Sequence, residues 1–436
     1  MVGLLLSLIT LSVSVVSAAC TAAPGVGTVA LEAAMAARLL LGRLAGVASR
    51  PEWHRQCGRA LAAQPCAVPE VEDRRAGRDN GHARPRWVDA LGDVRSDWTR
   101  EEVGEVFASP LLELVFKAQT VHRMYHDPRM VQRCTLLNIK SGGCPEDCKY
   151  CSQSSKWSKD VDMKAEKLMD LDSVLEAAQR AKAAGSTRFC MGAAWRGPSQ
   201  VGPRQWERVL KMVKEVKAMG MEVCTTLGMV TPEQARQLKE AGLTAYNHNL
   251  DTSPEYYSKI TTTRKYEDRL NTLEAVREAG IGMCAGGIIG LGEGIHDRVG
   301  LLHQLASLPV HPDSVPINRL VAIKGTPMQD EKLVDSLDLV RCIATARIVM
   351  PRSMVRLAAG RLKLSLADQG MCFMAGANSI FSGDQLLTTP NNDKSEDDVM
   401  FQVLGLMEKP YNPPKDALHR DVRMHGKQHH QASTVQ

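Results

Sequence analysis

Residues 203–227 read PRQWERVLKMVKEVKAMGMEVCTTL, which contains one helical pattern followed by one strand pattern. Apolar side chains recur at helical spacing up to Met219, and Gly220 stands where a helix commonly ends. Residues 222–227 form a short run rich in β-branched residues, as in a strand. The stretch therefore predicts a helix over residues 203–220 that leads into a strand over residues 222–227.

The same alternation extends in both directions from about residue 104. Further helices are predicted over 172–185, 232–242 and 266–280, each ending in glycine. Further strands are predicted over residues 135–139, 186–191, 245–249, 282–289, 313–318, 353–358 and 377–381. About eight such units in roughly 300 residues favour a closed (β/α)8 barrel of the TIM type over an open doubly wound sheet. In such a barrel, the chemistry is expected at the C-terminal ends of the strands and in the loops that follow them.

Charge and aromatic content narrow the class of partner. The chain has 436 residues and a formal net charge of +5. Residues 1–69 contain five arginines and two acidic residues, a net +3, so the rest of the chain carries only +2. Aromatic residues make up 4% of the chain, too few for a surface that stacks bases. The sequence therefore predicts neither a nucleic-acid partner nor a membrane partner.

Residues 1–85 are predicted to be a targeting leader and linker that is disordered or removed. Residues 1–18 have the apolar core of a secretory signal without its basic start, whereas the segment from Met35 is rich in Arg and Ala and nearly free of acids. That composition is typical of an organelle transit peptide, and it predicts the mitochondrial matrix; secretion is the alternative. The catalytic domain is predicted over residues 86–405, with a disordered tail over 406–436.

SGGCPEDCKYCSQ, at residues 141–153, places Cys144, Cys148 and Cys151 in a C-x3-C-x2-C spacing after the first predicted strand. Three thiolates on one short loop can hold three irons of a cubane iron–sulfur cluster and leave the fourth iron open to a substrate. A tetrahedral zinc ion would need a fourth ligand, and no further Cys or His is close in the sequence. A zinc loop, or three unrelated cysteines, is the alternative.

Three more cysteines and one arginine fall within separate predicted strands. Cys190, Cys224 and Cys284 belong to the second, third and fifth strands and Arg356 to the seventh, so each can point into the barrel from a different side. A free buried cysteine is commonly just a small hydrophobic residue. Three at comparable positions on separate strands instead favour a shared site. The remaining cysteines of the body are interpreted as structural thiols: Cys134, Cys342 and Cys372.

Polar side chains follow the fourth predicted strand in YNHNLDTSPE, residues 246–255. The amides of Asn247 and Asn249 can recognise a urea-like group or a ribose, and the carboxylate of Asp251 suits ribose hydroxyls. An Asx-rich turn is the alternative. GGIIGLGE, residues 286–293, lets the backbone approach a flat ligand but lacks the third glycine of a dinucleotide fingerprint.

Together these stretches resemble the biotin synthase family of the radical S-adenosylmethionine superfamily. The three-cysteine loop alone would identify only the superfamily, whereas the whole set is specific to the family. The matching segments run in order from about residue 104 to about residue 405: GGCPEDCKYC, GSTRFCMGAAWR, YNHNLDTSPE, GGIIGLGE, VPINRL, KGTPM, ARIVMP, VRLAAGR and MCFMAGANSIFSGDQLLTTP.

The resemblance implies ligands for two clusters. The loop cysteines would ligate a [4Fe–4S] cluster whose open iron binds S-adenosylmethionine. The strand residues would ligate a [2Fe–2S] cluster deep in the barrel: Cys190, Cys224, Cys284 and Arg356. Arginine is a rare ligand, and it avoids the negative charge that a fourth thiolate would add. Cys134 departs from the family pattern, because a hydroxyl residue is expected at its position.

The resemblance also implies contacts to two small molecules. For S-adenosylmethionine, Asn249 and Asp251 would contact the ribose, and the backbone of Tyr150 would lie beside the adenine. For the substrate, the residues near the ureido ring would be Asn247, Asn249 and Asn318, and those near the carboxylate tail Thr388 and Thr389.

The implied reaction is the insertion of sulfur into dethiobiotin, the last step of biotin biosynthesis. An electron from the [4Fe–4S] cluster would cleave S-adenosylmethionine to methionine and a 5′-deoxyadenosyl radical, which abstracts hydrogen from the substrate. A sulfide of the [2Fe–2S] cluster would quench the carbon radical, and a second round would close the ring.

The same residues leave two alternative classes of protein open. The alternative enzyme is a lipoyl synthase-like sulfur inserter, which carries a second three-cysteine motif that this chain lacks. A zinc-bound structural protein is the alternative outside enzymes. The expected partners are an electron-donor protein, the iron–sulfur assembly machinery and a second copy of the chain in a homodimer.

Overall fold

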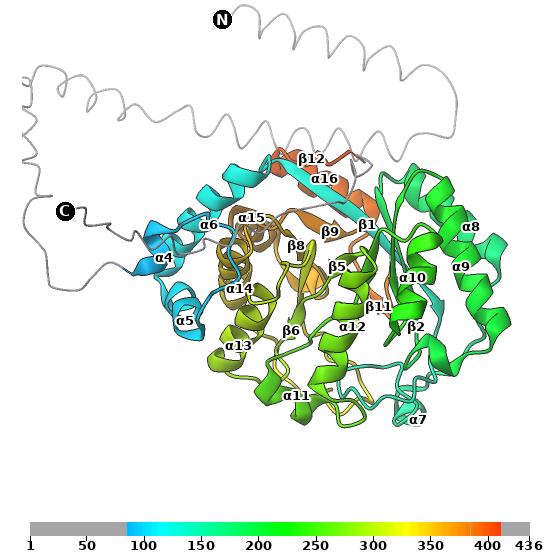
Figure 1. Ribbon diagram of the computed structural model, residues 1–436. Helices are drawn as coiled ribbons and strands as arrows, with labels where there is room; N and C mark the ends of the chain where they lie inside the picture. Colours follow the sequence, from blue (N-terminus) through cyan, green and yellow to red (C-terminus); the bar gives the residue numbers. More distant parts are fainter. Residues whose placement is uncertain (1–84, 384, 411–436) are drawn as a thin grey trace, which may run out of the picture. The chain divides into compact units, whose positions relative to one another are not determined.

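The computed structural model describes residues 85–383 and 385–410 (Figure 1). The predicted leader, the start near Met35 and most of the predicted tail lie outside the described residues. Among the helices of the described part, none is both long enough and apolar enough to cross a bilayer.

Parallel strands close into a barrel, as predicted. Strand β1 pairs with β2 on one side and with β9 on the other, which closes the sheet. The remaining order around the barrel is β2-β3-β4-β5-β7-β8-β9, with β6 also paired to β7. The barrel strands are β1 (Met130–Lys140), β2 (Arg188–Ala193), β3 (Glu222–Thr226), β4 (Ala245–Asn247), β5 (Gly282–Cys284), β6 (Gly287–Ile289), β7 (Ser314–Arg319), β8 (Met354–Leu357) and β9 (Ser379–Phe381).

The fifth barrel position differs from the prediction, which was one continuous strand over residues 282–289. It is split into β5 and β6 by Ala285 and Gly286. At Gly286 the backbone comes so close to β7 that an added Cβ would lie 2.0 Å from the carbonyl oxygen of Pro316. The amide of Gly286 donates to Asn249 Oδ1 at 3.2 Å instead of to a strand. The prediction of a continuous strand is therefore wrong at these two residues.

The helices surround the barrel and cover its apolar outer face (Figure 1). In α9, the buried side chains Val209, Met212, Val213 and Val216 follow the helical period and form one face. The helices after β1 are α7 (Ser158–Val161), α8 (Leu171–Ala183), α9 (Pro203–Ala218), α10 (Pro232–Glu240), α11 (Pro254–Ile260), α12 (Tyr266–Glu278), α13 (Ile295–Ala306), α14 (Ser336–Val349), α15 (Leu366–Met374) and α16 (Lys394–Leu404), with short 3-10 turns at Pro198–Gln200 and Arg361–Lys363.

Three helices precede the barrel: α4 (Arg86–Asp89), α5 (Arg100–Ala108) and α6 (Leu111–Tyr125). Helix α5 begins with a capping box, because the Thr99 side chain accepts from the amide of Glu102 and the Glu102 carboxylate accepts from the amide of Thr99, each at 3.1 Å. Helix α6 packs along α14, so these helices extend the outer layer of the barrel.

Two small additions follow the last barrel strand. A hairpin of β10 (Gln385–Leu386) and β11 (Thr389–Pro390) lies beside the barrel mouth. Strand β12 (Met407–Glu408) then pairs with the start of β1, and Glu408 lies 3.4 Å from the buried guanidinium of Arg133. The folded part therefore continues past residue 405, where the catalytic domain was predicted to end, and includes the first residues of the predicted tail.

Candidate active site

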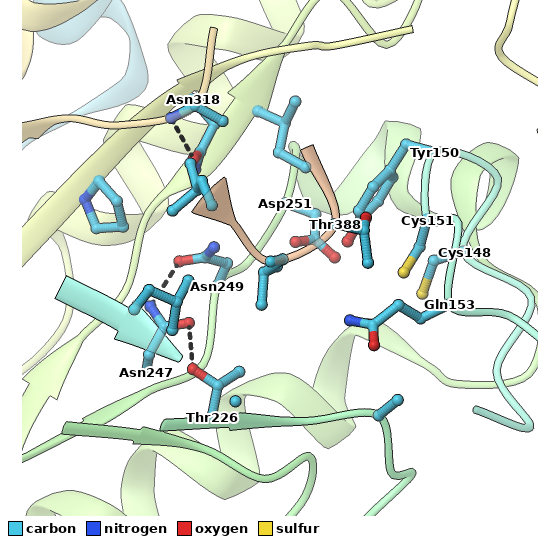
Figure 2. Close-up of a pocket in the computed structure, with 18 of the residues that line it drawn as sticks. Cys148, Tyr150, Cys151, Gln153, Thr226, Asn247, Asn249, Asp251, Asn318 and Thr388 are labelled. Carbon is cyan, nitrogen blue, oxygen red and sulfur yellow. Dashed lines mark hydrogen bonds between the residues drawn. The ribbon is translucent and has the colours of Figure 1, made fainter. Parts of the chain in front are cut away.

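One cavity of about 310 Å³ opens among the C-terminal ends of the barrel strands and the loops that follow them (Figure 2). All fourteen residues predicted for the clusters, the cofactor and the substrate line this cavity, from Cys144 in the first loop to Thr389 in the β10–β11 hairpin. The structure thus brings the predicted set together, while the role of each residue stays a prediction.

The three-cysteine loop is held in place by its own backbone. Gly142 and Gly143 have φ angles of +64° and +70°, and a Cβ on Gly142 would lie 2.7 Å from the carbonyl oxygen of Lys164. The amide of Cys144 donates to the carbonyl of Gln153 at 2.9 Å, which closes the loop. The indole nitrogen of Trp157 donates to the carbonyl of Cys151 at 2.8 Å. The positions of the loop thiols are therefore set by turns at the two glycines and by hydrogen bonds to backbone carbonyls.

A buried carboxylate and an arginine support the same loop. Glu146, between the first two cysteines, forms ion pairs with Arg196 at 2.9 Å and with Arg264 at 3.4 Å. Arg264 Nη2 in turn donates to Cys148 Sγ at 3.2 Å. Burial raises the pKa of the Cys144 thiol and raises that of Cys151 to about 12. The guanidinium of Arg264 beside Cys148 therefore offsets part of the free-energy cost of burying negatively charged thiolates at this site.

The strand cysteines converge in the barrel interior. Cys190 on β2 and Cys224 on β3 are register partners on neighbouring strands. Cys284 on β5 joins them in a buried group whose other walls include Leu136 and Phe381. Hydrogen bonding to Cys190 raises the pKa of Cys224, hydrogen bonding to Cys224 raises that of Cys284, and burial acts in the same direction on both. Three thiols from three strands therefore share one buried space.

Arg356 on β8 completes this group from the other side of the barrel. Its side chain is 1% exposed, and Nη1 lies 3.7 Å from Cys284 Sγ. Nε donates to Ser379 Oγ at 2.9 Å, and Nη2 lies 3.4 Å from Cys134 Sγ. Cys134, interpreted as a structural thiol from the sequence, is thus fully buried directly beside the predicted arginine ligand.

Figure 2 shows the amide side chains of Asn247, Asn249 and Asn318 on the wall of the cavity. Asn247 Nδ2 donates to Cys284 Sγ at 3.3 Å and to Asn249 Oδ1 at 3.2 Å, while Asn247 Oδ1 accepts from Thr226 Oγ1 at 3.2 Å. Asn318 Nδ2 donates to the carbonyl of Gly287 at 3.0 Å. These hydrogen bonds fix the orientation of each amide. The side chains predicted to contact a ureido ring are therefore already oriented without it.

Asp251 lies between the amides and the three-cysteine loop. Its φ of +65° is in the left-handed region, and its carbonyl accepts from the amide of Ile288 at 2.8 Å. Its buried carboxylate forms an ion pair with Arg269 Nη2, and Arg269 Nε donates to the hydroxyl of Tyr257 at 2.9 Å. Tyr150 lines the same part of the cavity. The carboxylate is therefore held in one orientation toward the cavity.

Several residues of the site carried no signal that the sequence analysis used. Arg264 and Arg269 reach the cavity from the segment around the start of α12, outside the motifs named above. Glu146 lies inside the CPEDC motif and could have been singled out as an acidic residue next to metal ligands. Ser152 and Gln153 directly follow the last loop cysteine and also line the cavity.

The donor sets fit iron–sulfur clusters. Thiolates are the usual protein ligands of such clusters, and both groups of thiols face the cavity. Across residues 85–383 and 385–410, no three His, Cys, Asp or Glu side chains gather closely enough to hold a single metal ion. A tetrahedral zinc ion takes all its ligands on one metal, whereas a cubane cluster takes its thiolates on separate irons.

A parallel barrel with a three-cysteine loop at its mouth defines a radical S-adenosylmethionine enzyme. The family model of the radical SAM superfamily matches residues 138–305, and that of the biotin and thiamin synthesis associated domain matches residues 316–407. The crystal structure of methylornithine synthase superposes with a TM-score of 0.60 over 71% of this chain and 94% of its own, at 17% identity, which supports the barrel fold alone.

The chain belongs to the biotin synthase family. A protein of Arabidopsis thaliana named mitochondrial biotin synthase is 59% identical over 317 residues, which cover 72% of this chain and 83% of that protein. The biotin synthase of Cytophaga hutchinsonii is 57% identical over 316 residues, covering 72% of this chain and 93% of that protein.

Proposed function

We propose that the two groups of thiols on this cavity hold the two iron–sulfur clusters with which the family makes biotin. The chain is a radical SAM enzyme that forms biotin from dethiobiotin and uses S-adenosylmethionine, a [4Fe–4S] cluster and a [2Fe–2S] cluster. The assignment of particular residues to these groups is the proposal. The [4Fe–4S] cluster would be held by Cys144, Cys148 and Cys151, and the [2Fe–2S] cluster by Cys190, Cys224, Cys284 and Arg356.

The observation that carries the proposal is that both thiol groups open onto one cavity, with polar side chains between them. Figure 2 shows Cys148 and Cys151 on one side of the cavity and Asn247 and Asn249 on the other, with Asp251 between them. When bound, the clusters supply the electron that cleaves S-adenosylmethionine and the sulfur that enters the substrate. The chain's own contribution is to keep both sites and the substrate in line within one space that excludes water.

Asn249, Asp251 and Tyr150 are proposed to bind S-adenosylmethionine. The ion pair with Arg269 holds the carboxylate of Asp251 in one orientation, as hydrogen bonding to two ribose hydroxyls requires. Tyr150 belongs to the three-cysteine loop, so a base beside its backbone would lie close to the loop cluster. These contacts would place the cofactor between the loop thiols and the amides.

Dethiobiotin is proposed to bind through the amides and the hairpin. Asn247, Asn249 and Asn318 present fixed amide groups to a ureido ring. Asn247 also donates to Cys284 Sγ, so a ring bound there would lie next to the strand thiols that hold the sulfur source. Thr388 and Thr389, on the β10–β11 hairpin, line the same cavity and would lie near the carboxylate tail.

An anaerobic assay tests the proposed function as a whole. The protein, reconstituted with iron and sulfide, is incubated with S-adenosylmethionine, a reductant and dethiobiotin, and the products are measured by mass spectrometry. We expect both 5′-deoxyadenosine and biotin. Fully loaded clusters that yield neither product would refute the proposal, as would reconstitution with stoichiometric zinc and no labile sulfide.

The remaining partners and the cellular location are also proposals. We propose an electron-donor protein, the iron–sulfur assembly machinery and a second copy of the chain as partners, a catalytic domain that starts near residue 86, and a leader that directs the chain to the mitochondrial matrix from a start near Met35. The name of the Arabidopsis relative supports the location. Chains tagged at the C-terminus and started at Met1 or at Met35 should both accumulate in mitochondria, whereas secretion of either would contradict the location.

A further inference from the structure

We propose that Ser152 is a further substrate-binding residue, whose hydroxyl binds the substrate carboxylate together with that of Thr388. The inference rests on the proposed function, which places the carboxylate tail of dethiobiotin near Thr388 and Thr389. Ser152 follows Cys151 directly in the three-cysteine loop, is 3% exposed and lines the cavity. Its Oγ lies 2.6 Å from Thr388 Oγ1, although the two residues are 236 positions apart in the chain.

Ser152 and Thr388 differ from Thr389 in whether a hydroxyl proton remains to bind the substrate. Thr389 Oγ1 donates to the carbonyl of Leu386 at 3.0 Å, so its proton is already used within the hairpin. The pair of Ser152 and Thr388 has two hydroxyl protons, and only one of them can lie between the two oxygens. The other hydroxyl proton is free to bind an acceptor in the cavity. A carboxylate has two oxygens, so it can accept from both hydroxyls once their mutual bond is released.

The hairpin is positioned to keep this pair at the cavity. Asn391 Nδ2 donates to the carbonyls of Phe381 and Gly383, at 3.1 and 2.9 Å, which ties the end of the hairpin to the end of β9. Leu387, at the hairpin turn, has a φ of +55°, which non-glycine residues rarely adopt and which the surrounding contacts must hold. A Cβ on Gly192 of β2 would lie only 3.2 Å from Leu387 Cδ2, so this leucine sits tightly against the barrel.

The contact has a chemical consequence for the substrate. Hydrogen bonds to an ionised acceptor are stronger than those between neutral groups, so a carboxylate gains more from the pair than the hydroxyls gain from each other. Because Ser152 adjoins Cys151, a carboxylate bound here is tied to the same loop that carries the loop cluster. The geometry therefore points to Ser152 as a residue that selects substrates with an ionised tail and fixes their distance from the cluster loop.

The test compares the Ser152→Ala variant with the unaltered enzyme in a binding measurement without turnover. Equilibrium dialysis is run on cluster-loaded protein with S-adenosylmethionine and no reductant, using either dethiobiotin or its methyl ester. The variant should bind dethiobiotin about tenfold more weakly, as expected for one lost hydrogen bond to a charged group, and the ester less than twofold more weakly. Thr388→Val should give the same pattern, and the double variant should lose less than the two single losses combined, because each removes the same pair.

Ser155→Ala is the matched control, because Ser155 lies on the same loop but is exposed and does not line the cavity. It should bind both ligands like the unaltered enzyme, and the iron content and visible spectrum of all variants should match. Equal weakening of acid and ester by Ser152→Ala would overturn the inference, since it would indicate only a displaced hairpin. Unchanged binding of the acid would overturn it as well. If the unaltered enzyme failed to bind or convert dethiobiotin, the proposed function itself would fail.

Discussion

At the scale of single residues, Arg356 is the least ordinary member of the site. A buried guanidinium usually pairs with a carboxylate, yet the polar contacts of its nitrogens here are Cys284 Sγ, Cys134 Sγ and Ser379 Oγ. The positive charge of Arg356 therefore lies next to cysteine sulfur atoms. That arrangement suits a site whose other three donors are thiols, because the arginine cation offsets the charge of the thiolates that form when metal binds.

The division between the two thiol groups predicts different effects on the two halves of the reaction. Cys190→Ala removes a strand thiol and leaves the three-cysteine loop unchanged, so 5′-deoxyadenosine should still form at a reduced rate while biotin formation is abolished. Anaerobic product analysis by mass spectrometry measures both products in one sample. Cys372→Ala is the control, because Cys372 is a buried thiol on α15 away from the cavity, and it should leave both products in place. An equal loss of both products in Cys190→Ala would contradict the division.

At the scale of elements, the break between β5 and β6 is a requirement of packing. The backbone at Gly286 fits against β7 only because the residue has no side chain, and its amide is one of the two donors, with Asn247 Nδ2, to Asn249 Oδ1. The break therefore divides the fifth barrel position into two short strands. It also orients the Asn249 amide, which belongs to the proposed cofactor site.

Gly286→Ala is predicted to destabilise the fold by about 3 kcal/mol, because the new methyl group would collide with backbone atoms that have no room to move. Chemical denaturation of the cluster-free protein measures the change. Gly104→Ala offers a control of opposite sign. Gly104 lies inside α5, where an added Cβ would meet only Val299 at 3.9 Å, so the helix should gain up to about 1 kcal/mol. Similar changes in both variants would show that the close approach at Gly286 is not the cause.

Elements also show how far the sequence could predict this molecule. Local signals sufficed for the helix ends, since the glycines predicted to end four helices, Gly185, Gly220, Gly242 and Gly280, all have positive φ. They did not suffice for the split of residues 282–289, because that break depends on the backbone of β7, about thirty positions further along the chain. Arg264 and Arg269 were missed for the same reason: each is identified only by the buried group it meets in space, Cys148 or Asp251.

At the scale of the whole molecule, β1 is the strand that closes the barrel. It pairs with β2, β9 and β12, and so joins the first and last parts of the described chain. The three-cysteine loop starts where β1 ends. The same strand therefore closes the barrel and positions the start of the three-cysteine loop.

The spacing of the two thiol groups along the chain implies an order of assembly. Cys144, Cys148 and Cys151 lie within eight consecutive residues, so a chain that has not yet folded can already present all three. Cys190, Cys224, Cys284 and Arg356 come from four strands and meet only once the barrel has closed. If the two groups hold the clusters as proposed, a chain that starts unfolded would mature in two stages, with the loop site available to iron and sulfide during folding and the inner site only afterwards, by way of the cavity mouth.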